Sequence, residues 1–245
     1  MRNRKAVGRW IGVMGMAGWI LLSGSAAGGD LSPADAPGQH FDLATYKLQT
    51  PMAERGNIEE VSQPALHDFS APFFYFEAST HAMVFNCPDN GAPTRGSHFP
   101  RSELRSINEW TFSGRHTLSA SLAVTQQPSS GNIIVGQIHG NAPGTEALKI
   151  RWSKGDVVVG IKTSPNITEE RFTLVHGLAL GDRIDYRIAQ SDHMVTVTIN
   201  GTSKSFTYDR KWDADTVYFK AGNYLQDNSA SGSAGVVKFY ALSSR

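Results

Sequence analysis

Alternation of apolar and polar residues over short stretches most constrains the fold of this 245-residue chain. In residues 116–125, every second residue is apolar: Leu118, Ala120, Leu122 and Val124. This spacing places the four side chains on one face of a β-strand. No sustained apolar spacing of a helix follows the N-terminal segment. The sequence therefore predicts an all-β protein.

Turn-forming residues divide the chain into short strands. Lys154-Gly155-Asp156 and Asn200-Gly201 each join two stretches of strand-like sequence and predict tight hairpins. Short strands with regularly spaced turns are typical of a β-sandwich or jelly roll. We see no repeat and no second domain, and we expect one domain over residues 41–245.

The first 27 residues have the layout of a secretory signal peptide. Four basic residues precede an apolar stretch, Trp10 to Leu22, and Ser25-Ala26-Ala27 offers a cleavage site of small residues. The apolar stretch is shorter than the ~20 residues that a spanning helix needs. We expect cleavage near Ala27, a linker over residues 28–40, and a secreted or periplasmic protein without a membrane anchor in its mature form. An uncleaved N-terminal anchor is the alternative.

The charge of the mature chain argues against nonspecific binding of nucleic acid. The sequence has 23 basic and 22 acidic residues; without the four basic residues of the N-terminal segment, 19 and 22 remain, a net charge of −3 with His neutral. Nucleic-acid binding depends on neutralising phosphates with basic side chains. A polyanion would therefore have to be held by a local basic cleft.

Three strings carry polar side chains at alternating positions. They are Arg101-Ser102-Glu103-Leu104-Arg105, Gln137-Ile138-His139 and Tyr218-Phe219-Lys220-Ala221-Gly222-Asn223-Tyr224-Leu225-Gln226. In a strand, residues two apart share a face, so the polar residues of each string point the same way. We expect Ile134 and Ile138 on the opposite, core face. A face rich in Arg, Lys, Gln, His and Tyr suits the binding of a carboxylate and the transfer of a proton.

The arginine and histidine strings each have a functional and a structural explanation. Arg101 and Arg105 could hold a carboxylate with their planar guanidinium groups while Glu103 fixes them, or the three could form an ordinary ion-pair ladder. His139, with Gln137 on the same face, could accept a proton near neutral pH, or it could be structural.

The third string has the same two explanations. Tyr224 could transfer a proton with help from the nearby charge of Lys220, or it could be an ordinary strand aromatic. Gly222 lies between them, and a glycine in a strand often marks a close approach. We expect a sugar ring to lie against it.

Together the three strings predict β-elimination from a uronic acid. Hydrogen bonds and cations that neutralise the C6 carboxylate stabilise the enolate-like transition state; a base then removes the C5 proton and an acid protonates the departing O4. We find no metal-ligand spacing in the sequence, so we expect no metal and no cofactor. The lone Cys87 excludes an intrachain disulfide and shows no feature of a reactive thiol.

In this order, the three strings resemble those of the alginate lyases of polysaccharide lyase family seven. That family is marked by Arg-Ser/Thr-Glu-Leu-Arg, Gln-Ile/Val-His and Tyr-Phe-Lys-Ala-Gly-x-Tyr-x-Gln. Further similar strings are Phe41-Asp42-Leu43, Pro88–Gly91, His98–Arg101 and Val237–Tyr240, so the resemblance covers residues 41–245. It implies a β-jelly-roll sandwich whose concave sheet binds alginate, and an endo-acting enzyme that we expect to be a monomer.

The resemblance also implies roles for single residues. Arg101, Gln137 and His139 would neutralise the substrate carboxylate. Tyr224 would act as the acid, and also as the base where the C5 proton and O4 lie on the same side of the ring; His139 would be the base for guluronate. The substrate-binding residues would be Glu103, Arg105, Lys220 and Gln226.

Two positions bear on specificity in this family. Ile138, where other members have Val, tends to accompany activity on guluronate-containing blocks. Ser106 stands where members often have Glu, and it alternates away from Arg105, so we expect little effect on the chemistry. The preference among guluronate, mannuronate and mixed blocks stays open at this point.

Two other classes of protein share a β-sandwich. A β-glucanase-like glycoside hydrolase would need two carboxylates about 5 Å apart, and no string of the type Glu-x-Asp-x-x-Glu occurs. A noncatalytic module that binds acidic polysaccharides would need neither His139 nor Tyr224. Only elimination would create an unsaturated uronate.

Overall fold

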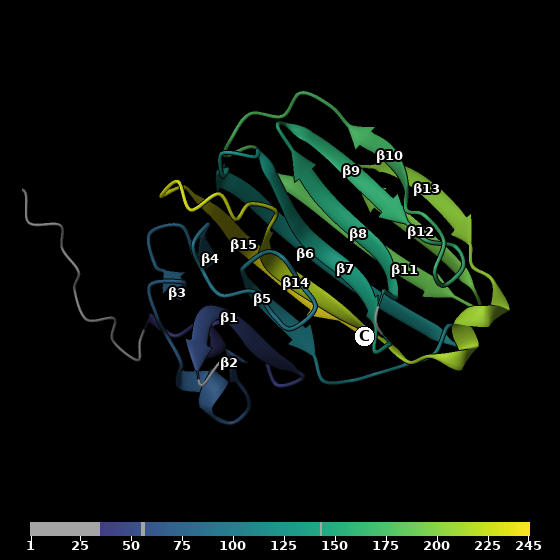
Figure 1. The fold of residues 1–245 in the computed structure, drawn as a ribbon, viewed down its shortest axis with the longest axis horizontal. Helices are drawn as coiled ribbons and strands as arrows, with labels where there is room; N and C mark the ends of the chain where they lie inside the picture. The colour runs from purple at the N-terminus through teal and green to yellow at the C-terminus, as the bar shows by residue number, and fades with distance from the viewer. Residues whose placement is uncertain (1–34, 55–56, 143) are drawn as a thin grey trace, which may run out of the picture. The chain divides into compact units, whose positions relative to one another are not determined.

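Two antiparallel β-sheets stack face to face in the computed structural model of the protein, which describes residues 35–54, 57–142 and 144–245 (Figure 1). The larger sheet comprises β1 (Tyr46–Glu54), β2 (Asn57–Val61), β5 (Arg101–Ser106), β7 (Asn132–Gly140), β8 (Glu146–Ser153), β9 (Asp156–Ile161), β10 (Glu170–Val175) and β14 (Val217–Leu225). The smaller sheet comprises β3 (Phe74–Glu77), β4 (Ala82–Pro88), β6 (Arg115–Gln126), β11 (Ile184–Ser191), β12 (Met194–Ile199), β13 (Thr202–Thr207) and β15 (Ala234–Ser244). The predicted β-jelly-roll sandwich is confirmed.

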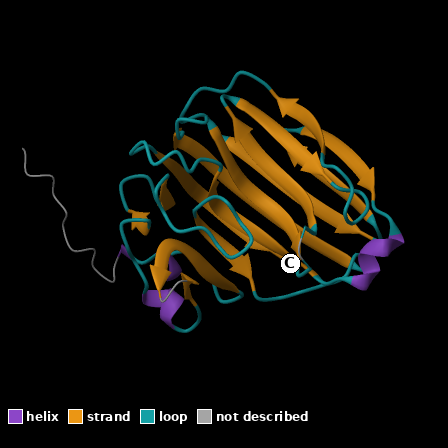
Figure 2. Cartoon of the chain, in the orientation of Figure 1, coloured by secondary structure: helices purple, strands orange, loops and turns teal. Residues whose placement is uncertain are grey.

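Helical structure in the described residues is limited to short 3-10 turns (Figure 2). The turns that can be bounded are η2 (Pro37–Gln39), η3 (Ala65–Asp68) and η4 (Arg210–Ala214). None of the helices in this part of the chain is long and apolar enough to cross a membrane.

Strand order in the larger sheet brings distant parts of the chain together. The order is β10-β9-β8-β7-β14-β5-β1-β2. Strand β14, near the end of the sequence, therefore lies between β7 and β5 (Figure 1). The three strings singled out in the sequence occupy these three neighbouring strands.

The core lies between the two sheets, where the apolar residues of alternating strands meet. On β6, Leu118, Leu122 and Val124 are completely buried, as the alternation predicts. Burying a side chain of this size stabilises the fold by about 1.5–3 kcal/mol. Cys87 belongs to the same core, and burial raises the pKa of its thiol, which accords with a structural role.

Both predicted hairpins form where expected. Lys154-Gly155 joins β8 to β9 and Asn200-Gly201 joins β12 to β13. The two central residues of each turn have positive φ angles, as a type I′ turn requires. These turns fix the register of the strands that they join.

The last residues of the expected linker are packed onto the domain. Ala36 is completely buried, and the ring of His40 stacks on Phe76 with ring centroids 3.5 Å apart. Ordered structure thus begins before Phe41. The expected signal peptide and the first residues of the linker lie outside the described residues.

One expectation about strand β7 is wrong. Ile134 was expected on the core face with Ile138, but it pairs with Tyr224 and Arg151 on the outer face of the sheet. The register of β7 shifts between Ile134 and Gly136, and such a bulge reverses the alternation. Ile138, which follows the bulge, does lie in the core.

Candidate active site

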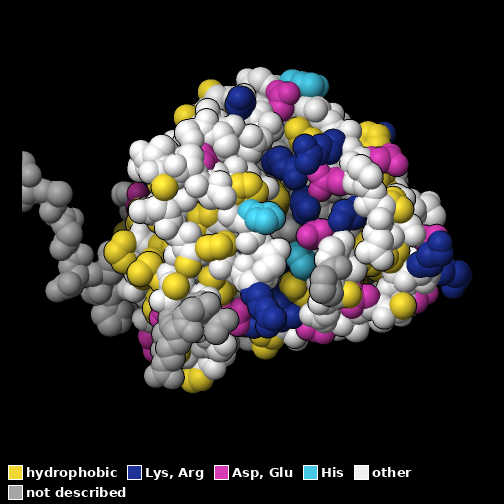
Figure 3. Space-filling view, viewed as in Figure 1, with side chains coloured by type: hydrophobic (Ala, Val, Ile, Leu, Met, Phe, Trp, Pro, Cys, Tyr) yellow, Lys and Arg dark blue, Asp and Glu magenta, His cyan; other side chains and the backbone are white. Residues whose placement is uncertain are grey.

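The outer face of the larger sheet is hollowed into a cleft of about 590 Å³. Lys and Arg side chains gather along this hollow, with carboxylates and a His among them (Figure 3). Six of the eight residues predicted for the site line the cleft: Arg101, Gln137, His139, Lys220, Tyr224 and Gln226. A local basic cleft thus exists on a chain whose overall charge is nearly balanced.

Strand register brings these side chains together. Lys220 of β14 is paired with Gln137 of β7 on one side and with Arg105 of β5 on the other. Tyr224 is likewise paired with Arg101. Residues directly opposite each other in a sheet share a face, so the polar positions of all three strands converge on the outer side.

Glu103 lies beneath the floor of the cleft and is completely buried. Its carboxylate accepts hydrogen bonds from Arg101 Nη1 at 3.1 Å, Lys220 Nζ at 2.6 Å and Gln137 Nε2 at 2.5 Å. Burial alone would raise the pKa of Glu103, but the charges of Lys220 and Arg101 outweigh it and keep the pKa below its usual value. Glu103 therefore stays ionised.

The prediction that Glu103 binds substrate is not supported by this position. Its side chain is enclosed by Arg101, Lys220 and Gln137, which stand between it and the cleft. A charge buried in this way requires partners, and Glu103 holds each of the three in place. It is a positioning residue.

Gln137 lines the cleft although its side chain is completely buried. Nε2 donates to Glu103, whereas the buried Oε1 has no hydrogen-bond partner among the described residues. An unpaired buried acceptor is costly. A ligand that donates a hydrogen bond at this point would remove the cost.

His139 is oriented by the backbone. Its Nδ1 lies 2.7 Å from the carbonyl oxygen of Gly140 and 3.2 Å from the hydroxyl of Tyr218. A carbonyl only accepts hydrogen bonds, so Nδ1 carries the proton and Nε2 is the free acceptor. Burial, followed by the charge of Lys220, lowers the pKa of His139 to about 4. The imidazole is therefore neutral near pH 7 and able to accept a proton.

Tyr224 is held by a hydroxyl and a guanidinium group. Its hydroxyl oxygen lies 2.8 Å from Ser97 Oγ, and the guanidinium carbon of Arg101 lies 3.8 Å from the centre of its ring. Arg101 also donates to Ser97 Oγ at 3.1 Å. These contacts fix the position of the phenol at the cleft.

Arg105 is displaced from the place predicted for it. Its guanidinium stacks on the ring of Tyr218 at 3.8 Å and donates to Glu109 at 2.8 Å and to Asn141 at 3.1 Å. Arg105 does not line the cleft, whereas Tyr218 does. The predicted contact of Arg105 with substrate is therefore not supported, because its charge is used to position Tyr218.

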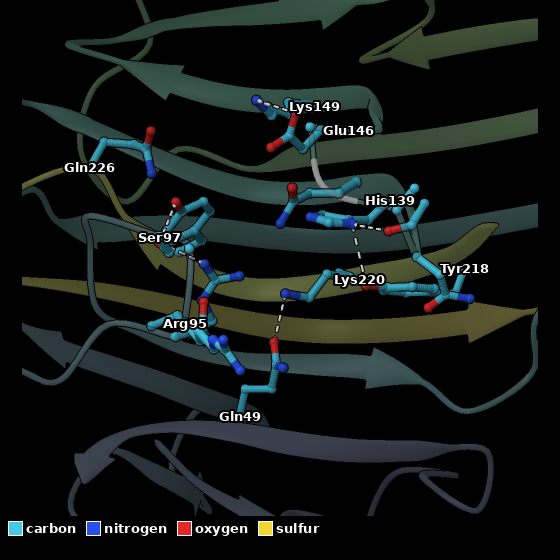
Figure 4. A pocket seen from close by; sticks show the side chains of 18 residues that line it. Gln49, Arg95, Ser97, His139, Glu146, Lys149, Tyr218, Lys220 and Gln226 are labelled. Atoms are coloured by element: carbon cyan, nitrogen blue, oxygen red, sulfur yellow. Dashed lines mark hydrogen bonds and ion pairs between the residues drawn. The ribbon is translucent and has the colours of Figure 1, made fainter. Parts of the chain in front are cut away.

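Lys220 is almost completely buried at the bottom of the cleft. Nζ donates to Gln49 Oε1 at 2.6 Å as well as to Glu103 (Figure 4). Burial, followed by the charge of Arg101, lowers the pKa of Lys220 from its ordinary value. Two oxygen partners hold the ammonium group in one position.

The space expected above Gly222 is absent. A Cβ atom at this position would lie 2.8 Å from both Glu103 Cα and the carbonyl oxygen of Ser102, and φ is +147°. Gly222 therefore allows β14 to approach β5 closely, and backbone atoms fill the space that was expected for a sugar ring. The register of β14 shifts between Ala221 and Tyr224, which explains the difference.

Several residues that line the cleft were not singled out from the sequence. They are Gln49, Arg95, Ser97, Asn141, Glu146 and Lys149, and Figure 4 shows most of them around Lys220 and His139. Lys149 was detectable, because it alternates with Arg151 in a strand-like stretch. Gln49 and Ser97 belong to no motif and reach the site only through strand pairing and a loop.

The described residues offer no cluster of three or more His, Cys, Asp or Glu side chains that could hold a metal ion. Among the charged groups of the cleft, Arg101 and Lys220 pair with Glu103, and Lys149 pairs with Glu146. What the site contains is a set of cations and amides, a neutral imidazole and a phenol, which can neutralise a carboxylate and transfer a proton.

Comparison with known proteins identifies the family. The family model described as alginate lyase matches residues 41–245. The solved structure of alginate lyase A1-II′, a member of polysaccharide lyase family seven, is 35% identical with a TM-score of 0.80, covering 86% of this chain and 98% of that one. Alginate lyase PA1167 of Pseudomonas aeruginosa is 30% identical with a TM-score of 0.78, covering 83% and 99%. A curated alginate lyase of Klebsiella pneumoniae is 23% identical over 252 residues, covering 78% of this chain and 81% of that protein. The chain therefore belongs to the alginate lyases of polysaccharide lyase family seven.

Proposed function

We propose that this enzyme cleaves alginate by β-elimination, breaking the 1,4-glycosidic bond and leaving a 4,5-unsaturated uronate at the new non-reducing end. The observation that supports this most directly is that a neutral His139 and the phenol of Tyr224 line one cleft together with Arg101 and Gln137. This combination serves the removal of a proton next to a carboxylate.

The first requirement is neutralisation of the C6 carboxylate. Arg101 supplies a positive charge and hydrogen-bond donors. The free Gln137 Oε1 and His139 Nε2 are acceptors, so the neutralising charge comes from Arg101. The enolate-like transition state carries more negative charge on this carboxylate than the ground state does. Fixed donors at that point therefore lower the barrier to loss of the C5 proton.

The second requirement is a base and an acid. In guluronate the C5 proton and O4 lie on opposite sides of the ring, so two groups are needed. His139 takes the proton through Nε2 and Tyr224 donates one to the leaving O4. In mannuronate both lie on the same side, and Tyr224 performs both steps. In each case one C–H and one C–O bond break and the C4–C5 double bond forms.

We propose that guluronate-containing chains are substrates and that cleavage is endo-acting. The free Nε2 of His139 supplies a second group for proton transfer besides Tyr224. Variants of A1-II′ have been solved with the product GGG and, in a variant with a His and a Tyr replaced, with the substrate GGMG. The open cleft accords with binding in the middle of a chain. Lys220 and Gln226, which line the cleft, would bind the sugars.

We further propose that the protein acts as a secreted or periplasmic monomer. The signal-peptide layout of residues 1–27 supports export. Comparing the mature N-terminus of protein from a culture's medium and periplasm with the full sequence would test this, and size-exclusion chromatography would test the oligomeric state.

The decisive experiment is digestion of polyguluronate, polymannuronate and mixed blocks, followed over time by product size and ultraviolet absorbance. Elimination predicts one double bond for each new reducing end. Hydrolysis would give reducing ends without the double bond, and a binding module would give neither. Early products of intermediate length would support endo cleavage, whereas small products alone from the start would contradict it.

A further inference from the structure

A carboxylate of the chain itself is held by three cations beyond the reacting groups. Glu169 Oε1 lies 2.6 Å from Arg171 Nε and 3.4 Å from both terminal nitrogens of Arg151. Its Oε2 lies 3.3 Å from Lys149 Nζ. The charges of these groups, together with the hydrogen bond from Arg171, outweigh burial and lower the pKa of Glu169. The carboxylate is therefore ionised.

The surroundings of the Glu169 carboxylate form a defined anion-binding site. The side chains of Arg151 and Glu169 are 8% and 12% exposed. The floor is Gly160, where a Cβ atom would lie 2.6 Å from the carboxyl carbon of Glu169. Glycine thus makes room for a carboxylate. Lys149 also lies 3.9 Å from Glu146, which is paired with Lys162 at 3.0 Å. Four cations thus face two carboxylates, and a net positive charge remains.

This anion site is continuous with the cleft. Lys149, which lines the cleft, is paired with Gln137 on one side and with Gly160 on the other, and Gly160 is paired with Arg171. The four residues form one row across neighbouring strands. A uronate chain that runs across the strands from the reacting sugar would reach Lys149 and then Arg171, with Arg151 two residues along β8 from Lys149.

The place of Glu169 next to an edge strand would allow its side chain to leave the three cations. It immediately precedes β10, the edge strand of the sheet, which pairs within that sheet only with β9. The neighbouring residues 166–168 are exposed. Edge elements of this kind open more readily than the core.

We propose that Lys149, Arg151 and Arg171 form a carboxylate subsite for a uronate beyond the reacting sugar, and that Glu169 occupies this subsite as an internal competitor until the substrate displaces it. The proposal rests on the proposed function, because the ligand is the uronate chain. Long chains reach the subsite, and part of their binding free energy is lost in displacing Glu169. Short chains do not reach it. Glu169 therefore sets how affinity depends on chain length.

The test measures equilibrium binding in the Tyr224→Phe background, where chains should stay uncut. Binding of a guluronate hexamer and of a dimer is compared with and without Glu169→Gln. The amide keeps the shape but removes the competing charge, so we expect about three- to tenfold tighter binding of the hexamer and no change for the dimer. The hexamer's affinity should also fall more steeply with salt.

Glu170→Gln is the matched control, since it removes the same charge from the exposed neighbouring residue. This substitution should leave the difference in affinity between the hexamer and the dimer unchanged. Glu169→Asp keeps the charge but withdraws it by one methylene, and it should give a smaller gain in the same direction. It also serves as the second variant if Glu169→Gln unfolds.

The subsite assignment is tested by Arg151→Gln. In that background, Glu169→Gln should no longer tighten binding of the hexamer, because the two residues are coupled. Weaker or unchanged hexamer binding in Glu169→Gln, with thermal unfolding unaltered, would overturn the proposal. If the wild-type enzyme forms no unsaturated ends, the proposed function fails, yet the binding comparison still reports on the subsite.

Discussion

The carboxylate of Glu103 lies 2.6 Å from the ammonium group of Lys220 on the neighbouring strand, and both residues are buried under the cleft. The same carboxylate accepts hydrogen bonds from Arg101 and Gln137. One buried anion therefore positions three of the groups that face the substrate. The catalytic arrangement depends on a residue that does not touch the sugar.

Replacing Glu103 with Gln tests this dependence. Arg101 and Lys220 would lose their shared counter-charge in a buried position, and we expect a loss of about 3–5 kcal/mol in the free energy of unfolding. Turnover should fall about 100-fold, because the donors to the substrate carboxylate lose their orientation. Urea unfolding and initial rates measure the two effects.

Glu109→Gln provides the matched control for Glu103. Glu109 also pairs with an arginine, Arg105, but it is exposed, so its loss should cost less than about 1 kcal/mol. Equal losses of unfolding free energy and turnover in the two variants would show that the effect of Glu103 does not depend on its burial.

Tyr224→Phe should reduce turnover on every block at least 100-fold, because it removes the acid but little contact area. Binding of a guluronate oligomer, measured by calorimetry, should change by less than about threefold. Tyr240→Phe is the control, since Tyr240 lies on β15 in the other sheet and stacks on Arg183. Retained turnover in Tyr224→Phe would remove this residue from the mechanism.

His139→Ala should impair the two kinds of block unequally. On polyguluronate it removes both the base and a contact to the carboxylate, whereas on polymannuronate Tyr224 still serves as the base. We expect the loss in kcat/KM to be at least tenfold greater for polyguluronate. An equal loss on the two polymers would mean that His139 acts only on the carboxylate.

The pH dependence follows from the pKa of His139, which burial and Lys220 lower to about 4. The neutral base then persists well below ~6.5, its ordinary pKa. We expect kcat/KM on guluronate oligomers to fall only as the pH drops towards 4. The free energy of unfolding changes in the same direction. On acidification the unfolded chain binds the proton of His139 before the folded chain does, so the contribution of the neutral imidazole to stability is full above ~6.5 and is lost as the pH falls towards 4.

Titration of the His139 ring by NMR, assigned by comparison with His139→Ala, checks this directly. A midpoint near 4 agrees with the structure. A midpoint at 6 or above would contradict the lowered pKa, and the fall in kcat/KM would then begin near that pH.

The sequence predicted the fold and the strands of the site because alternation is a local property. Leu118 to Val124, the hairpin at Asn200-Gly201 and the outward direction of Gln137 and His139 all follow from period-two spacing and turn chemistry. Two bulges were not predictable in this way. The shift after Ile134 and the shift around Gly222 depend on how neighbouring strands pack, which single strands do not encode.

Burial also separated the roles of residues that look alike in the sequence. Glu103 and Arg105 share a face with Arg101, yet one lies beneath the cleft and the other stacks on Tyr218. Ser97 comes from a loop, and Gln49 reaches Lys220 from a strand 171 positions away in the sequence. Such contacts arise only in the assembled sheet.

The most direct test is the crystal structure of Tyr224→Phe with a guluronate tetrasaccharide. The account predicts one ring whose carboxylate is bound by Arg101 beside Gln137, with His139 Nε2 facing the C5 proton and residue 224 on the side of O4. A chain bound with that carboxylate turned away from Arg101 and Gln137, or with His139 and residue 224 at different sugars, would contradict it.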